Sequence, residues 1–195
     1  MSPANRMQIT LIDCGSKRLS MLVEIMAMNG AVVSSVPLDQ ANLRDFSDSD
    51  GVVISGGPHL FTGRHGATLI DSFRFIDSLR IPVLGICLGH QAIGIRHGAA
   101  VFRAAARRSN ETVHLQGGHP LTAGLEEIIT LRADHCEGIE APDGFTIIAG
   151  SEYYRNEIMI NDSDRLYGIQ CHPEDSGASG RQLITNFLQL IMGKP

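Results

Sequence analysis

The chain has 195 residues, of which 43% are hydrophobic and 19% charged, and a formal net charge of −5. This length suffices for a substantial core, so we expect one domain over residues 1–195, with fraying at 1–6 and 193–195. The mild negative charge and the lack of long Lys or Arg runs disfavour nucleic acid as a partner. No apolar stretch is long enough to cross a membrane and no signal-peptide pattern opens the chain, so we expect a cytoplasmic protein.

Residues that commonly bind metals show no compact spacing. The four cysteines contain no C-x-x-C pair, which argues against a zinc ribbon or a redox dithiol. The histidines likewise match no compact set of ligands. We therefore expect no metal site, and we interpret Cys14, Cys136 and Cys171 as small buried residues.

The first half of the chain alternates strand-like and helical patterns. Short β-type runs bounded by turn residues alternate with stretches whose apolar residues recur every three or four positions. Such βαβ alternation predicts a parallel sheet with helices on both faces. The expected strands are 8–12, 31–36, 51–55 and 81–86, and the expected helices are 16–29, 68–79 and 88–96.

The second half has strand-like runs separated by Gly, Pro, Asp and Asn, and it closes with an amphipathic helix. This spacing predicts antiparallel strands that flank or extend the sheet. The fold class is thus α/β, with an open, mostly parallel sheet and antiparallel strands in the second half. The expected strands are 99–102, 112–115, 128–133, 145–149, 157–160 and 166–170, and the expected helix is 180–192.

A cysteine between two glycines is the first candidate for chemistry. The buried run 81–86 leads into Gly85-x-Cys87-x-Gly89 and then into a helical pattern. Small residues on both sides permit a tight, strained strand-to-helix turn that exposes a nucleophile at the carboxyl end of the sheet. The following helix presents its N-terminal amides to the thiolate of Cys87. The alternative is a buried cysteine whose neighbouring glycines only permit close packing.

A cysteine nucleophile needs a base, and His172-Pro173-Glu174 supplies a candidate. We expect a strand to deliver His172 at its end, and Glu174 to face the same side in an extended chain. A carboxylate can then hold the imidazole while its other nitrogen faces Cys87. Taken alone, this segment fits a surface histidine and a solvated glutamate better than a catalytic pair. Together with Gly85-x-Cys87-x-Gly89, the catalytic interpretation is favoured.

A strand that ends in two glycines and a proline is the third candidate. Glycines at a strand end let backbone amides approach a ligand, so the amides of Gly57 and Leu88 could form an oxyanion hole. An ordinary Gly-Pro turn is the alternative.

Together these segments resemble a known enzyme family. Ser55-Gly-Gly-Pro58, Gly85-Ile-Cys-Leu-Gly-His-Gln91 and Gly168-Ile-Gln-Cys-His-Pro-Glu174 occur in this order, and the chain is similar to the class I (triad) glutamine amidotransferases. With Leu11-Ile-Asp-Cys-Gly-Ser16, the resemblance is greatest to the glutamine amidotransferase domain or subunit of GMP synthase. It covers nearly the whole chain and implies a flavodoxin-like fold.

The resemblance implies a role for each motif residue. Cys87 attacks the glutamine carboxamide to give a γ-glutamyl thioester, His172 protonates the departing ammonia and then activates water, and Glu174 orients His172. The amides of Gly57 and Leu88 hold the oxyanion. The positions implied to bind the substrate glutamine are Gln91, Gly56, Asp134 and His135.

The resemblance also implies a partner. The family passes ammonia to an ATP-dependent synthetase, here most similar to the one that converts XMP to GMP. The chain ends where the amidotransferase domain ends, so we expect a separate ATP-pyrophosphatase subunit. We expect no cofactor in this chain, with ATP and magnesium only in the partner.

Several positions depart from the family pattern. Cys171 replaces an aromatic residue, and Asp134-His135-Cys136-Glu137 replaces Ser-His-x-Asp; Lys17-Arg18 and Arg108-Ser109-Asn110 also differ. Two alternatives stay open beside the amidotransferase. One is a free-standing cysteine hydrolase of γ-glutamyl amides or peptides, and the other is a regulatory paralogue in which Cys87 is a redox sensor or an inert thiol.

Overall fold

The structure, a computed structural model, describes residues 6–193. The expected fraying at residues 1–5 and 194–195 lies outside this range. Within the described residues, no helix combines the length and the apolarity needed to span a bilayer.

A nine-stranded sheet forms the centre of the molecule, in the order β2-β1-β3-β4-β11-β10-β9-β6-β7. The first five strands of this order are parallel, and the remaining neighbours are antiparallel. A separate antiparallel pair joins β5 and β8. The strands are β1 (Gln8–Asp13), β2 (Val32–Pro37), β3 (Gly51–Ile54), β4 (Val83–Ile86), β5 (Val101–Arg107), β6 (Asn110–Leu115), β7 (Ile128–Arg132), β8 (His135–Ile139), β9 (Thr146–Ser151), β10 (Ile158–Asn161) and β11 (Leu166–Ile169).

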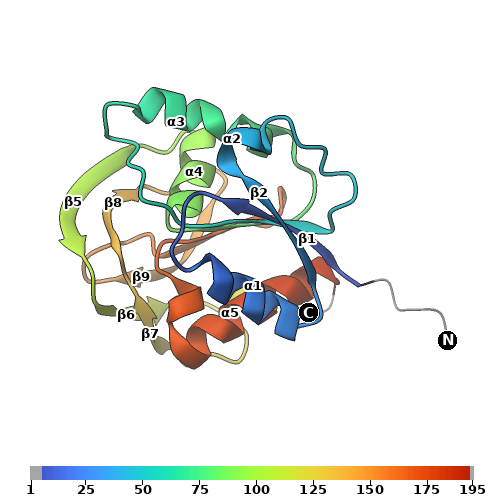
Figure 1. The fold of residues 1–195 in the computed structure, drawn as a ribbon. Coiled ribbons are helices and arrows are strands. Elements are labelled where there is room, and N and C mark those ends of the chain that lie inside the picture. The colour runs from blue at the N-terminus through green and yellow to red at the C-terminus, as the bar shows by residue number, and fades with distance from the viewer. Residues whose placement is uncertain (1–5, 194–195) are drawn as a thin grey trace.

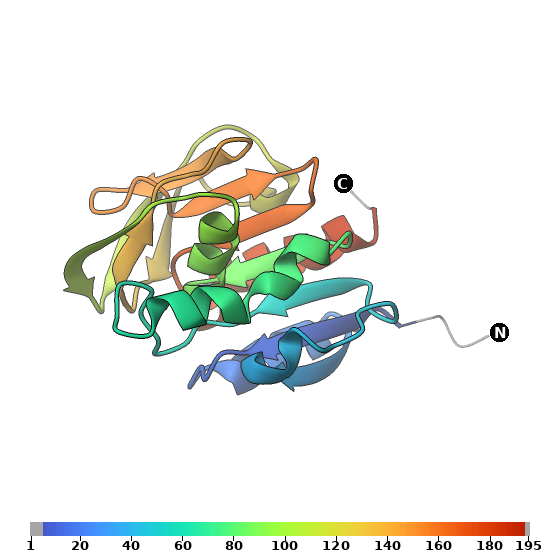
Figure 2. The ribbon, with the colours of Figure 1, turned by 90° about the horizontal axis from the view of Figure 1, so that it is seen from above.

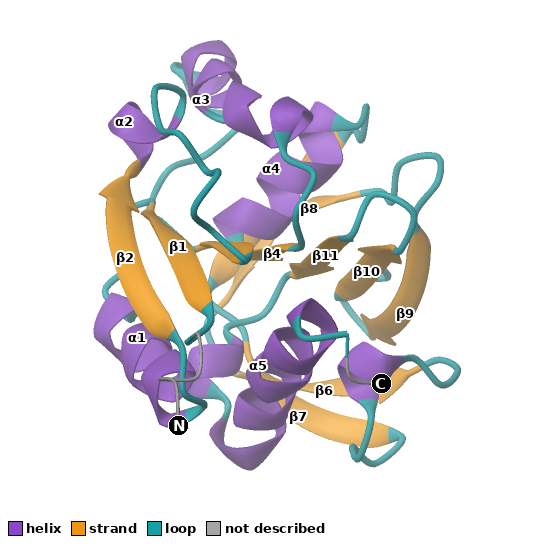
Figure 3. Cartoon of the chain, turned by 90° about the vertical axis from the view of Figure 1, so that its right-hand side faces the viewer, coloured by secondary structure: helices purple, strands orange, loops and turns teal. Residues whose placement is uncertain are grey.

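Helices cover both faces of the parallel part of the sheet (Figures 1 and 3). Helices α1 (Leu19–Met28) and α5 (Gly177–Ile191) lie on one face, whereas α2 (Leu38–Ala41), α3 (Gly66–Ser72) and α4 (Leu88–Arg96) lie on the other. Seen from above, the second-half strands extend the sheet on the side of β11 away from β1 (Figure 2). Three short 3-10 helices complete the fold: η1 (Arg74–Ser78), η2 (Pro120–Thr122) and η3 (Pro173–Asp175).

The side-chain alternation of the strands produces two cores. On β1, Ile9 and Leu11 face the α1–α5 layer, while Ile12 faces the α2–α4 layer. A parallel strand buried on both faces must be apolar on both, as this strand largely is. The sheet thereby holds its strand ends in a fixed position, and the candidate site lies beyond the carboxyl ends of its central strands β4 and β11.

The expected fold class, an α/β fold with a mostly parallel sheet and added antiparallel strands, is confirmed. The single helix expected over 68–79 was wrong: it divides into α3 and η1. The side chain of Asn42 accepts a hydrogen bond from the Phe75 amide and donates one to the Asp71 carbonyl. Those two backbone groups would otherwise bond each other in an α-helix, so Asn42 interrupts the helix from outside.

Helix α2, strand β8 and the 3-10 helices η2 and η3 were not predicted, and the strand expected at 99–102 instead runs from Val101 to Arg107. Strand β8 carries a charge at Glu137 and a glycine at Gly138, both unusual within strands. A Cβ at Gly138 would lie 2.5 Å from the Tyr154 ring, so glycine is required by close packing there.

Candidate active site

Cys87 occupies the turn between β4 and α4. Its φ of 50° is in the region that side chains rarely adopt. A Cβ at Gly85 would lie 2.4 Å from the backbone of Gly89, and one at Gly89 would lie 2.5 Å from the carbonyl oxygen of Ile54. The Gly-x-Cys-x-Gly pattern therefore has the tight strand-to-helix geometry expected from the sequence.

His172 and Glu174 form the second part of the site. The His172 Nδ1 lies 2.8 Å from Glu174 Oε1, and both side chains are buried. Contrary to expectation, Glu174 is not reached through an extended chain: β11 ends at Ile169, and Glu174 lies in the 3-10 turn η3. The turn brings the carboxylate back toward the imidazole because it shortens the rise per residue.

The backbone around His172 is fixed by β7 and by a hydroxyl. The His172 amide donates to the carbonyl of Arg132 at 2.7 Å. The Ser176 Oγ donates to the His172 carbonyl at 2.5 Å and accepts from the Arg132 amide at 2.8 Å. Sequence reasoning missed Ser176, whose only local signal is its position two residues after Glu174.

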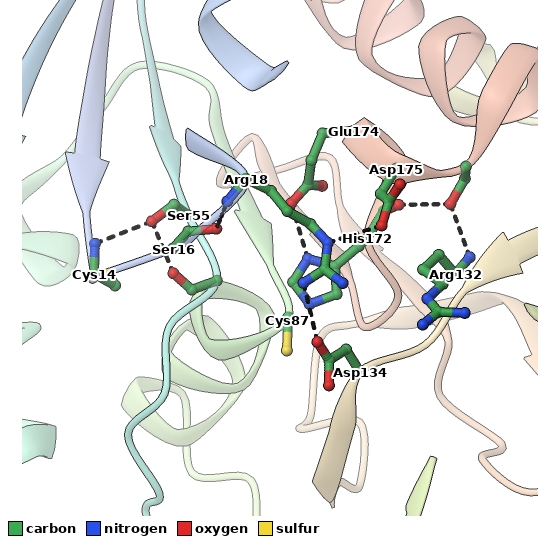
Figure 4. A network of polar contacts seen from close by, with 12 residues as sticks. Cys14, Ser16, Arg18, Ser55, Cys87, Arg132, Asp134, His172, Glu174 and Asp175 are labelled. Atoms are coloured by element: carbon green, nitrogen blue, oxygen red, sulfur yellow. Dashed lines mark hydrogen bonds and ion pairs between the residues drawn. The ribbon is translucent and has the colours of Figure 1, made fainter. Parts of the chain in front are cut away.

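Gly56 separates the two halves of the site and keeps them close. A Cβ at this position would lie 2.7 Å from the His172 Cε1 and 3.4 Å from the Cys87 Cβ. The imidazole thus lies next to the thiol, with Glu174 on its far side (Figure 4). Burial alone would lower the pKa of His172, but hydrogen bonding to Cys87 and Glu174 raises it to about 10. The protonated form of His172 is therefore favoured.

A pocket of about 510 Å³ opens above Cys87, and Gly57 and Leu88 line it as well. The Gln91 amide donates to the Cys87 carbonyl in the first turn of α4. The earlier amides of this turn, including that of Leu88, have no carbonyl available within the helix. Gly57 packs closely on the backbone just after β1, since a Cβ there would lie 2.2 Å from the Cys14 carbonyl oxygen. The two residues whose amides are expected to form an oxyanion hole thus line the same pocket as Cys87.

Gln91 lines this pocket but is already engaged inside the protein. Its Nε2 donates to the Glu137 carbonyl at 2.9 Å and to Gln170 Oε1 at 3.1 Å. The Gln170 Nε2 in turn lies 3.9 Å from the Cys87 sulfur. Gln170 was not among the predicted site residues, although it belongs to the segment that carries His172. The amide nitrogen of Gln91 is consequently not free for a substrate.

Asp134 forms part of the pocket wall and pairs with arginines. Its carboxylate is 3.0 Å from Arg18 Nη1 and 3.6 Å from Arg108 Nε, and Arg18 also pairs with Asp175 at 2.9 Å (Figure 4). Burial would raise the pKa of Asp134, but Arg18 lowers it, and the net shift is downward. Asp134 therefore stays ionised, and Arg18, which directly precedes α1, compensates its negative charge.

His135 borders the pocket and is 9% exposed. Burial lowers its pKa to about 4, so the ring is neutral near pH 7. Its Nδ1 lies 3.2 Å from the Glu137 carbonyl oxygen. The Nδ1 side of the ring is thus held by the backbone of β8.

Glu137 fixes the loop that covers one side of the pocket. Its two carboxylate oxygens accept the backbone amides of Phe61 at 2.8 Å and Thr62 at 2.9 Å, and the Thr62 hydroxyl also donates to it. Sequence reasoning noted Glu137 only as a departure in a motif. A charged residue that is 1% exposed within a strand is the signal of such an anchoring role.

Comparison with known proteins identifies the family. The family model for glutamine amidotransferase class-I matches residues 10–190. A glutamine-hydrolyzing GMP synthase from Clostridium perfringens is 38% identical over 146 residues, which are 73% of this chain and 28% of the relative. A separate subunit of the glutamine-hydrolyzing GMP synthase from Methanosarcina barkeri is 34% identical over 73% of this chain and 74% of the relative. This chain thus spans about a third or less of the full-length synthases but most of the separate subunits.

A solved structure agrees with this result. The crystal structure of a candidate GMP synthase subunit from Thermoplasma acidophilum superposes with a TM-score of 0.88 at 26% identity, covering 98% of this chain and 96% of that one. The resemblance that the motifs indicated is therefore confirmed. The chain belongs to the class-I glutamine amidotransferase family.

Proposed function

We propose that this chain hydrolyses the side-chain amide of glutamine at Cys87 and supplies the ammonia to a separate ATP-dependent synthetase. The observation that carries the proposal is that Cys87 and His172 line one pocket side by side, while Glu174 is hydrogen-bonded to His172 from behind. Each member of this set has the chemistry that its place demands: a thiol nucleophile, an imidazole base and a carboxylate that orients it.

In the proposed reaction, the Cys87 sulfur attacks the carboxamide carbon while its proton resides on His172. The carbon–nitrogen bond then breaks, and His172 gives its proton to the leaving ammonia. A water molecule, deprotonated by His172, cleaves the thioester to release glutamate and restore the thiol. Gly57 and Leu88 line the pocket where the oxyanion would form, which supports their amides as its donors.

The ammonia acceptor is proposed from the relatives. Several curated relatives are GMP synthases or separate subunits of that enzyme. We therefore propose that XMP is the acceptor and that the partner is an ATP-pyrophosphatase subunit. ATP and magnesium would then bind only to that partner.

Cationic residues at the pocket rim favour a second candidate function. Lys17 and Arg108 border the pocket along with Arg18, and of these three only Arg18 pairs with two carboxylates within residues 6–193. Cations at a pocket rim favour a substrate with an additional carboxylate. A γ-glutamyl peptide has one, and a free-standing hydrolase of such peptides would need no partner.

The test is ammonia release from glutamine by the wild type and Cys87→Ser, each with and without an ATP-pyrophosphatase subunit. The proposal predicts that Cys87→Ser loses at least about a thousandfold in rate, and that the partner increases the wild-type rate. The matched control is Cys136→Ser, because Cys136 is a second thiol that borders the same pocket; this variant should keep its activity.

Three outcomes would contradict the proposal in different ways. Equal loss in both serine variants would point to a general effect of altering the pocket. Partner-independent cleavage of a γ-glutamyl peptide, faster than that of glutamine, would favour the free-standing hydrolase. A folded wild type that is silent in every condition would favour the regulatory paralogue.

A further inference from the structure

Three side chains able to bind a metal meet beside the candidate active site. They are His135 at the start of β8, Glu157 just before β10, and Cys171 just after β11. One potential ligand atom from each lies within 4.8 Å of the others, and all three residues are buried. Because they are far apart in the sequence, the fold alone brings them together.

The ring of His135 is oriented as a metal ligand would be. Its Nδ1 lies 3.2 Å from the Glu137 carbonyl oxygen; a carbonyl can only accept, so Nδ1 carries the proton, and Nε2 of the neutral ring carries the lone pair. Nε2 is closed to solvent and has no hydrogen-bond partner among residues 6–193. The Tyr154 ring packs edge-on against the imidazole with centroids 4.5 Å apart. Histidines that bind metals usually donate their other N–H to a carbonyl or carboxylate in this way.

The carboxylate of Glu157 is also held from outside the cluster. Ser151 donates its hydroxyl to Glu157 Oε1 at 2.7 Å. The other oxygen, Oε2, lies 3.3 Å from the Cys171 sulfur. One oxygen is therefore used for orientation, and the second faces the thiol.

We propose that His135 Nε2, Glu157 Oε2 and Cys171 Sγ form a binding site for a divalent metal ion of the zinc class. One nitrogen, one oxygen and one sulfur suit a borderline-soft cation, and three protein ligands leave a fourth position open. Bond lengths of about 2.0–2.3 Å place tetrahedral ligands roughly 3.5 Å apart. Glu157 Oε2 and Cys171 Sγ are already 3.3 Å apart, and the His135 nitrogen, within 4.8 Å of both, would move closer on binding. Binding releases the Cys171 thiol proton and any proton on Glu157.

Once an ion displaces the Cys171 proton, charge balance favours a divalent ion over a monovalent one. A buried thiolate and a buried carboxylate would together carry two negative charges in an apolar environment, which is costly without compensation. A 2+ ion neutralises both, and the neutral imidazole adds no charge. His135 also lines the pocket above Cys87, so the cluster adjoins that pocket.

The alternative is that the three groups share protons and bind no metal. Cobalt(II) distinguishes the two, because a thiolate bound to it gives an intense sulfur-to-metal absorption band in the near ultraviolet. We would treat the full chain with a chelator, titrate it with Co²⁺, and then displace the cobalt with Zn²⁺. The proposal predicts the band at one equivalent of Co²⁺, its loss in Cys171→Ser, and an affinity at least about tenfold weaker in Glu157→Gln.

Cys87→Ser and Cys136→Ser are the matched controls, since both remove a thiol that borders the neighbouring pocket. Both should retain the band. The proposal is overturned if Co²⁺ gives no such band, if the band survives Cys171→Ser, or if it vanishes in Cys87→Ser. Should Cys171→Ser fail to fold, Glu157→Gln and His135→Asn decide instead: affinity unchanged in both overturns the site, and affinity weakened in both supports it. This readout does not depend on glutamine hydrolysis.

Discussion

The two sides of the pocket are built by different means. On the side of the parallel strands, Cys87 is positioned by backbone packing, with glycines at positions 56, 85 and 89 where a Cβ would collide. On the opposite side, the wall contributed by β8 and the turn before it is positioned by polar side chains, including Glu137 and the pair of Arg18 with Asp134.

The two means of positioning differ in whether they can be recognised in a short sequence motif. Close packing demands glycine at fixed spacings along a short segment, so it leaves a local pattern. Pairs such as Arg18–Asp134 join residues more than a hundred positions apart, so they produce no local sequence pattern. Because backbone packing positions one side of the pocket and polar side chains position the other, substitutions on the two sides should affect kcat and KM differently.

The largest effect should come from Gly56→Ala. The new methyl would lie 2.7 Å from His172 Cε1, so the imidazole must move away from Cys87. We expect kcat/KM for glutamine to fall by about a hundredfold, with a loss of about 1–3 kcal/mol in the free energy of unfolding. Steady-state ammonia release and chemical denaturation would measure the two effects.

Gly118→Ala is the matched control, because a Cβ there meets nothing within 4 Å. Its activity and stability should be unchanged. Wild-type activity in Gly56→Ala would show that backbone packing does not position the imidazole.

A smaller effect is expected from Glu137→Gln. The amide of glutamine has one oxygen where the carboxylate has two, so either the Phe61 or the Thr62 amide loses its acceptor. We expect a loss of about 1–3 kcal/mol in stability. KM should rise by roughly tenfold, which corresponds to about 1.4 kcal/mol in binding, while kcat changes little. Glu140→Gln, at an exposed position just after β8, is the control. If Glu137→Gln lowered kcat alone, Glu137 would affect the positioning of the catalytic residues and not only substrate binding.

The smallest effect should come from Arg18→Met. Arg18 pairs with Asp134 and Asp175, but the pairs are partly exposed, so their loss should cost no more than about 1 kcal/mol. We expect a modest rise in KM at unchanged kcat. Arg96→Met breaks a pair of similar exposure with Asp77 away from the pocket, and it should cost similar stability without any change in KM. If KM were the same in Arg18→Met and Arg96→Met, the Arg18–Asp134 pair would have no role in substrate binding.

Sequence reasoning was strongest where the signal was local. The strands from β1 to β4, the helices α1, α4 and α5, and the resemblance to the family followed from periodicity and from three short motifs. It failed where a distant side chain decides the structure. Asn42 ends α3 by capturing the hydrogen bonds of Asp71 and Phe75, and no pattern within the helix announces this.

The same reason explains what was missed at the site. Gln170 and Ser176 act through partners from other elements, and their types are common on any surface. Arg18 was noted only as a departure from the family pattern, without its pairs to Asp134 and Asp175. The expectation of an extended His172–Glu174 segment was wrong because tertiary contacts favour the 3-10 turn. The His172 amide donates to the Arg132 carbonyl, and the Ser176 hydroxyl bonds the backbone of both Arg132 and His172.

The backbone of Cys87 has a consequence for protein engineering. Its φ of 50° stores strain on the order of 1–3 kcal/mol in any residue with a side chain, and glycine would relieve it. A library of variants ranked by melting temperature alone would therefore favour Cys87→Gly, a protein without its thiol. Thermal screening of this chain selects against the nucleophile unless turnover is assayed alongside it.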